Sequence, residues 1–371
     1  MQRRKFLKRA ALAGAGGIGA ATSLPTPVIA QELPAINWRM ASSFPKSLDT
    51  IYGAAERVAK RIDEATDGKF KIRVFAAGEI VPGLQVLDAV QNATVECGHT
   101  AGGYYAGKDA TFGFDVGVPF GLNARQQTAW MLFGGGRELM RDLYKEYNII
   151  NFVAGNTGTQ MGGWFRKEIK TVEDLKGLKF RIGGFGGPVM VKLGVVPQMI
   201  AGGDVYLSLE KGTIDGAEWI GPYDDEKLGF NKIARVYHYP AWWEGCAQLS
   251  MLCNLDAFNK LPKTYQAIFE AACYEAHVWM TAKYDAQNPA ALRRLVVAGA
   301  QLRPFPRAVM EAAYQASHEL YAELSAKNPR FKKVYEPWVQ FRDAQVLWWR
   351  VAEHNFESFM IAATSNRPGS R

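Results

Sequence analysis

Short runs of alternating apolar and polar residues recur along the chain, separated by longer amphipathic stretches. Residues 69–75 alternate along nearly their whole length, which is typical of a half-buried β-strand. Residues 37–41 and 95–100 also predict strands, and helical stretches that end near Thr66 and Asn92 separate the three. The order strand, helix, strand, helix, strand indicates a doubly wound α/β unit.

The middle of the chain predicts a second sheet. Residues 149–153 are expected to form the strand that leads out of the first unit, and residues 160–166 and 178–182 the first strands of the next. Residues 242–254 predict an extended return to the first unit. Two units joined by strands, rather than by a flexible tether, would form a hinge.

Helical periodicity dominates the remaining segments, which are residues 125–147, 263–299, 309–326 and 338–363. Pro289 predicts an interruption of the second of these helices, because proline cannot donate the intrahelical hydrogen bond. The last segment is amphipathic with one apolar stripe, and we expect a single long helix there.

The N-terminus is first basic and then apolar, as in an export signal. The pair Arg3-Arg4 opens a twin-arginine pattern, an apolar run follows, and Ala30 ends a small-residue cleavage site. We expect residues 1–30 to be a twin-arginine signal peptide. Sec export is the alternative, because Gln2 stands where the twin-arginine pattern prefers Ser or Thr.

Most of the basic character of the chain lies in this signal. Its removal lowers the formal charge from +8 to +3, because it holds five basic residues and no acidic ones. The remaining charge gives no indication of nucleic-acid binding. No later stretch has the apolar length of a membrane span. We therefore predict a soluble protein of the periplasm.

The sequence holds four cysteines, which are Cys97, Cys246, Cys253 and Cys273. An oxidising compartment would permit disulfides. However, Cys246 and Cys253 would face opposite sides of one strand, and there is no CxxC motif. A chain of this length can bury a core without covalent staples, so buried free thiols are the expected state.

The clearest chemical signal is an arginine at a predicted strand end. Arg181 lies in the strand expected at residues 178–182, directly before the glycine-rich run 183–188. Ligands tend to bind at such strand ends in α/β folds, and a guanidinium offers a fork of donors that matches a carboxylate. Glu218 and Trp219 follow after a glycine-containing turn. Together these residues predict a carboxylate-binding site.

Residues 174–181 and 209–219 resemble segments of the extracytoplasmic solute receptors of TRAP (tripartite ATP-independent periplasmic) transporters. Residues 202–206 and 218–222 are most similar to the subgroup that binds 2-oxo acids together with a cation. The resemblance runs from about Asn37 to the last helix. It implies a receptor, with no covalent chemistry, that binds a small 2-oxo monocarboxylate such as pyruvate and delivers it to the TRAP membrane subunits.

The resemblance also implies which residues form the site. The residues carried over as substrate contacts are Arg181, Asn156, Gln160, Trp219 and Tyr104, with Tyr105 as the alternative to Tyr104. Those carried over as cation ligands, through oxygen atoms, are Gln160, Glu218, Trp219 and Glu244. Two buried carboxylates need a counterion, and hard cations prefer oxygen ligands. Sodium is the expected cation and calcium the alternative.

The implied fold is α/β, two-lobed and periplasmic-binding-protein-like (type II), with hinge strands and a long C-terminal helix. Lobe I would comprise residues 31–155 and 243–288, and lobe II residues 156–242 and 289–330. Residues 331–371 would form the long helix and tail. In the 2-oxo acid receptors this helix is exchanged between protomers, so a homodimer through it and packing against its own chain are both open.

Other functions have weaker support. Residues 14–19 match the dinucleotide motif GxGxxG but lie inside the signal, and residues 43–46 spell SxxK without its KTG or SDN partners. Two alternatives stay open: a twin-arginine-exported periplasmic enzyme with a bound cofactor, and a receptor of the same family for a 2-hydroxy acid such as lactate. No catalytic base or cofactor motif supports the enzyme.

Overall fold

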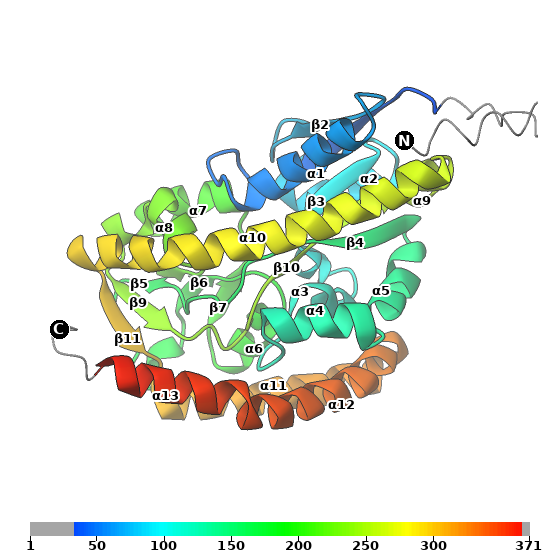
Figure 1. Cartoon of the computed structure of the whole chain (residues 1–371). Coiled ribbons are helices and arrows are strands. Elements are labelled where there is room, and N and C mark those ends of the chain that lie inside the picture. Colours follow the sequence, from blue (N-terminus) through cyan, green and yellow to red (C-terminus); the bar gives the residue numbers. More distant parts are fainter. Residues whose placement is uncertain (1–32, 366–371) are drawn as a thin grey trace, which may run out of the picture. The chain divides into compact units, whose positions relative to one another are not determined.

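The computed structural model describes residues 33–365, and residues 35–365 form one compact unit (Figure 1). The residues of the expected signal peptide, including the GxGxxG match, lie outside the described part. The fold is α/β with two separate sheets. In residues 33–365 no helix combines the length and the apolar character needed to cross a membrane.

The first sheet has five strands in the order β2-β1-β3-β10-β4. They are β1 (Ile36–Ser42), β2 (Phe70–Phe75), β3 (Cys97–Thr100), β4 (Ile149–Asn156) and β10 (Gln248–Asn254). β1 pairs in parallel with β2 and β3, whereas β10 runs antiparallel to β3 and β4. The sheet confirms the doubly wound unit and shows that the late strand β10 returns to it.

The second sheet has six strands in the order β11-β9-β5-β8-β6-β7. They are β5 (Trp164–Phe165), β6 (Lys179–Arg181), β7 (Val196–Gln198), β8 (Gly216–Ala217), β9 (Val236–Tyr239) and β11 (Gln301–Pro304). β6 is parallel to β7 and β8, so residues that follow β6 and β8 meet at one edge of this sheet.

The helices between the strands of the first sheet are α1 (Ile51–Ala65), α2 (Val86–Gln91), α3 (Gly113–Val116), α4 (Ala124–Phe133) and α5 (Gly136–Lys145). Those of the second sheet are α6 (Gly186–Lys192), α7 (Gly202–Glu210) and α8 (Pro222–Leu228). The C-terminal part holds α9 (Leu255–Asn259), α10 (Lys263–Val297), α11 (Arg307–Lys327), α12 (Pro329–Val351) and α13 (Glu353–Ser365). In Figure 1 the yellow helix α10 passes both sheets, and it packs against β4, α1 and α8.

Three helix predictions were wrong in detail. The helix expected at residues 125–147 is split into α4 and α5 at Gly135, whose φ of +86° only glycine adopts readily. The interruption expected at Pro289 does not end α10, which packs against β4, α1 and α8 and stays helical through the proline. The single helix expected at residues 338–363 is instead α12 and α13, which divide at Ala352.

α12 also begins earlier than expected, and the sequence contained the signal for this. The Asn328 side chain accepts hydrogen bonds from the backbone N–H of Arg330 (3.0 Å) and Phe331 (3.1 Å). Pro329 occupies the first helical position, which needs no N–H donor. α11 and α12 pack against each other, whereas the residues of α13 bury none of their side chains.

Candidate functional site

The strand ends of the two sheets meet around one small cavity of about 40 Å³. Phe44 and Tyr104 reach it from segments that follow β1 and β3, and Thr157 from the end of β4. From the second sheet, Arg181 is the last residue of β6, and Glu218 follows β8 directly. Arg181 thus lies at the end of its strand, as predicted, and at the carboxyl ends of parallel strands, where ligands tend to bind.

Arg181 is 2% exposed and is held on three sides. Its Nε donates to the backbone oxygen of Ile200 (3.1 Å), and its Nη1 donates to the Glu218 backbone oxygen (2.7 Å) and carboxylate (2.5 Å). The guanidinium lies 4.8 Å from the centre of the Trp219 ring. This side chain is therefore fixed in place and oriented before any ligand arrives.

Two carboxylates share this one guanidinium. Glu218 Oε1 accepts from Arg181 and from the Gly183 backbone N–H (2.6 Å), and burial raises the pKa of Glu218 against these two lowering influences. Burial and the negative charge of Glu218 raise the pKa of Glu244 well above its usual value, although Gln160 and Arg181 oppose the shift. With both glutamates ionised, the cavity would hold more negative than positive charge, and burial opposes this by favouring the protonated form of Glu244. A bound cation would instead stabilise the ionised form.

Gln160 adds an oxygen that lacks a partner. Its Nε2 donates to Thr157 Oγ1 (3.1 Å), whereas its buried Oε1 accepts no hydrogen bond within the described residues. Across residues 33–365, no three His, Cys, Asp or Glu side chains gather as a metal-ligand group. A cation here would therefore need amide and backbone carbonyl oxygens beside the two glutamates. The donor set fits a hard cation such as sodium or calcium.

Aromatic side chains form the apolar wall. Trp219 is 5% exposed and makes an edge contact with Phe44, the ring centres being 6.4 Å apart. Gly202 lies against the Trp219 ring so closely that a Cβ atom there would come within 2.3 Å of it. The position of this tryptophan thus depends on a glycine in the first turn of α7.

Of the two neighbouring tyrosines, only one lines the cavity. Tyr104 lines the cavity, and burial raises its pKa to about 12. The Tyr105 hydroxyl instead bonds with Thr100 Oγ1 (2.7 Å) and accepts from the Leu87 backbone N–H (3.1 Å). The structure thus brings Tyr104, rather than Tyr105, to the site.

Asn156 does not line the cavity. Its side-chain nitrogen contacts Cys246 Sγ (3.5 Å), and its Oδ1 accepts from the Gly158 backbone N–H (2.9 Å). The other predicted residues, Gln160, Arg181, Glu218, Trp219, Glu244 and Tyr104, all line the cavity. Sequence reasoning missed Phe44 and Thr157, although both follow strand ends, which was the signal used for Arg181.

None of the four cysteines lines the cavity. All four thiols are buried and unpaired, and burial raises the pKa of each. None is a reactive thiolate at neutral pH.

Residues 41–328 match the sequence profile of bacterial extracellular solute-binding protein, family 7 (DctP). The chain belongs to this family. Members of family 7 are transport receptors, so the enzyme alternative is excluded.

Similar family 7 proteins agree with this assignment. A monocarboxylate 2-oxoacid-binding periplasmic protein of Nostoc sp. is 53% identical over 97% of this chain and 99% of its own length. A TRAP transporter solute-binding protein of Bordetella bronchiseptica is 55% identical, with a TM-score of 0.89, covering 90% of this chain and 99% of that one. Its crystal structure is a mixed-occupancy dimer with calcium and picolinate in one site and an apo second site.

A third relative is the TRAP periplasmic solute-binding protein of Pseudoalteromonas atlantica, solved with bound sodium and pyruvate. It is 39% identical, with a TM-score of 0.84, covering 87% of this chain and 98% of that one. The two structures confirm the α/β fold with two sheets and long C-terminal helices.

Proposed function

We propose that this family 7 chain is the periplasmic receptor of a TRAP transporter, binding a small 2-oxo monocarboxylate such as pyruvate together with a metal cation. The proposal rests mainly on one observation. In a cavity of about 40 Å³, the buried ion pair of Arg181 and Glu218 lies beside Glu244 and a Gln160 oxygen that accepts no hydrogen bond. The ligands of the Nostoc and Pseudoalteromonas relatives support the same substrate class.

In this proposal the Arg181 guanidinium holds the substrate carboxylate, and the Trp219 and Tyr104 rings form the wall against its short apolar end. Asn156 supports the wall from the end of β4. Oxygen atoms of Gln160, Glu218 and Glu244 and the backbone carbonyl of Trp219 hold the cation, which supplies positive charge beside the substrate's anionic oxygens. Sodium is the first choice and calcium the alternative, since both metals occur in relatives.

The test is calorimetry of pyruvate binding to protein dialysed against a chelator, then supplemented with sodium or calcium. Binding should require an added cation, and Glu244→Gln should weaken the response to the cation. The same affinity in cation-free buffer would reject the cation site. Titration with lactate addresses the 2-hydroxy acid alternative, which would be favoured if lactate bound more tightly than pyruvate.

Delivery to the TRAP membrane subunits would follow closure of two lobes around the ligand. We propose the lobe boundaries already given, residues 31–155 with 243–288 and residues 156–242 with 289–330. The two sheets divide nearly accordingly, since β1 to β4 and β10 lie in the first set, apart from Asn156 at the end of β4, and β5 to β9 and β11 lie in the second. α10 passes from one set to the other at residue 288 and would bend there on opening.

We also propose twin-arginine export of the chain and cleavage after Ala30. The basis is the Arg3-Arg4 pattern and the apolar run behind it. Mass spectrometry of the periplasmic protein should give a chain beginning at Gln31. Unchanged export in a strain without the twin-arginine machinery would indicate the Sec route instead.

A homodimer through the C-terminal helices is the last part of the proposal. α13 buries no side chain, and its apolar residues Phe356, Phe359 and Ile361 are 66%, 69% and 68% exposed. Trp348 on α12 is also exposed, at 57%. The dimer of the Bordetella relative supports a second copy as the occupant. Light scattering should give a dimeric mass for the intact chain and a monomeric mass after deletion of residues 352–371.

A further inference from the structure

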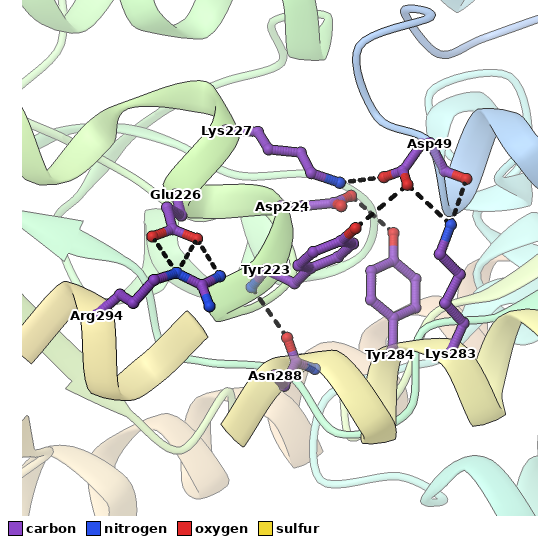
Figure 2. Close-up of polar contacts among 9 residues, drawn as sticks. All are labelled: Asp49, Tyr223, Asp224, Glu226, Lys227, Lys283, Tyr284, Asn288 and Arg294. Carbon is purple, nitrogen blue, oxygen red and sulfur yellow. Dashed lines mark hydrogen bonds and ion pairs between the residues drawn. The ribbon is translucent and has the colours of Figure 1, made fainter. Parts of the chain in front are cut away.

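Asp49 lies between β1 and α1, outside the ligand cavity, and has an unusual set of partners. Figure 2 shows its carboxylate facing Lys227 and Tyr223 of α8 and Lys283 of α10. It accepts from the Tyr223 hydroxyl (3.2 Å) and from Lys283 Nζ (2.9 Å), and it pairs with Lys227. The Asp49 carboxylate, which follows β1 of the first sheet, thus bonds to α8, which follows β8 of the second sheet.

The contact with Lys283 holds Asp49 in position. Lys283 Nζ also donates to the Asp49 backbone oxygen (2.9 Å), so one lysine binds two atoms of the same residue. This part of α10 is tied to α1, because Glu275 accepts from Arg57 Nε (2.8 Å) and from Arg61 Nη2 (3.0 Å). Asp49, α1 and the first half of α10 therefore behave as one body.

The partners on α8 are tied to the far half of α10. Arg294 Nη2 lies 2.6 Å from Glu226 Oε2, as Figure 2 shows. The bonds from Asp49 to Lys227 and Tyr223 therefore cross between the two bodies. The bond from the Tyr284 hydroxyl, beside Lys283, to Asp224 Oδ2 of α8 (2.7 Å) crosses as well, whereas the Glu275 and Arg294 bonds each lie within one body.

Both lysines are partly shielded from water, their side chains being 25% and 23% exposed, whereas that of Asp49 is 51% exposed. Burial raises the pKa of Asp49, but hydrogen bonds and charges of Lys227 and Lys283 outweigh it and lower the pKa to about 2. Asp49 is thus ionised at neutral pH. Partly buried pairs of this kind are less screened by salt than fully exposed ones.

The segment that carries Asp49 also closes the cavity. Phe44, five residues earlier, lines the cavity and contacts Trp219. The segments after β3 and β6, one from each sheet, also meet backbone to backbone, since a Cβ on Gly103 would lie 2.9 Å from Gly184 Cα. The parts of the chain that carry the first and the second sheet are called the two sides below. Because Arg181 and Trp219 are 2% and 5% exposed, a ligand can leave only when the sides separate.

We infer that Asp49 is a latch residue that holds the two sides together through Lys227 and Tyr223 and slows release of the bound ligand. The inference rests on the proposed receptor function for its effect on ligand, but the latch itself is a property of the chain. Opening breaks the Asp49 bonds to α8 and leaves Lys227 without its carboxylate.

The test compares Asp49→Asn with Lys46→Gln in the complete chain. Lys46 is in the same segment and also forms an ion pair, but its partner Glu79 (2.6 Å) follows β2 on the same side. Stopped-flow tryptophan fluorescence measures pyruvate release in sodium buffer. Asp49→Asn should release pyruvate about threefold to tenfold faster, the range expected for a partly buried ion-pair network, while Lys46→Gln stays at the wild-type rate.

Lys227→Met should accelerate release similarly, and the double variant with Asp49→Asn should add little, because both changes remove one interaction. Equal release rates for wild type and Asp49→Asn, or equal acceleration by Lys46→Gln, would overturn the latch.

A second readout needs no ligand. Spin labels on cysteines placed at the exposed positions Lys71 of β2 and Lys211 beyond α7 report the separation of the two sides. In ligand-free protein, Asp49→Asn should shift the distance distribution toward the open form relative to Lys46→Gln. Identical distance distributions for the two variants would reject the latch. Failure of the wild type to bind pyruvate would refute the receptor proposal alone, because the distance measurement needs no ligand.

Discussion

Replacing Arg181 with Met tests the centre of the proposed site. The change removes the guanidinium but keeps a long side chain for packing against Trp219, whose ring lies 4.8 Å from the guanidinium carbon. It also removes two hydrogen bonds to Glu218, at 2.7 and 2.5 Å. A substrate carboxylate entering this cavity would then meet two glutamates and no positive side chain.

The size of the effect follows from burial. Arg181 is 2% exposed, so water cannot replace its hydrogen bonds to a bound carboxylate. Removing one partner of a buried charge pair costs about 3–5 kcal/mol, which corresponds to a loss of affinity of about a hundredfold to a thousandfold or more. Arg181→Lys should fall between wild type and Arg181→Met, because an ammonium keeps the charge but lacks the planar fork.

Isothermal titration calorimetry with pyruvate and a saturating cation measures this loss. Arg166→Met is the matched control: Arg166 directly follows β5 in the same sheet and donates to the Leu209 backbone oxygen, outside the cavity. Circular dichroism establishes that each variant is folded. An affinity of Arg181→Met within about threefold of wild type would refute the assignment of the carboxylate to this residue, since that is the scatter of neutral surface changes.

Two further predictions concern positions outside the direct contacts. Gly202→Ala should weaken pyruvate binding and alter tryptophan fluorescence by displacing Trp219, whereas Gly203→Ala, with nothing within 4 Å of its Cβ, should change neither. Equal effects of the two changes would refute the dependence of Trp219 on Gly202. Burial raises the pKa of Asp225 from its ordinary value near 3.8 to about 7. Between about pH 4 and 7 the carboxyl therefore ionises in the unfolded chain but stays protonated in the folded one, so the stability of the fold decreases as pH rises through this window. The melting temperature of Asp225→Asn relative to wild type should therefore rise across that window, and a constant difference would contradict the account.

How far the sequence predicts this molecule depends on whether a feature is local. Arg181 at a strand end was predictable because alternation and the following glycines mark the strand and its end within ten residues. The split at Gly135 and the start of α12 at Pro329 also had local signals. The persistence of α10 through Pro289 had none, because it depends on β4, α1 and α8, which are distant in sequence.

Orientation at the site was the other limit. The family resemblance put Asn156 among the substrate contacts, yet its side chain bonds with the Gly158 backbone N–H and with Cys246 and does not line the cavity. Phe44 was passed over because an aromatic residue in a loop has no chemical signature of its own. Only the meeting of two sheets decides which strand-end residues face the cavity, and sequence periodicity within one sheet contains no information about the other.

From the charges of the cavity residues, we expect the substrate and the cation to bind together. Arg181 contributes one positive charge and Glu218 one negative charge, and Glu244 adds a second negative charge only when it is ionised. A monocarboxylate together with an ionised Glu244 would therefore give the site an excess of negative charge. Burial makes such an imbalance costly, because little water remains to screen it. A cation at Gln160, Glu218 and Glu244 would remove much of that cost, and its own retention would improve with the substrate's negative charge. On this account neither partner binds well alone, and the receptor would close only on the pair.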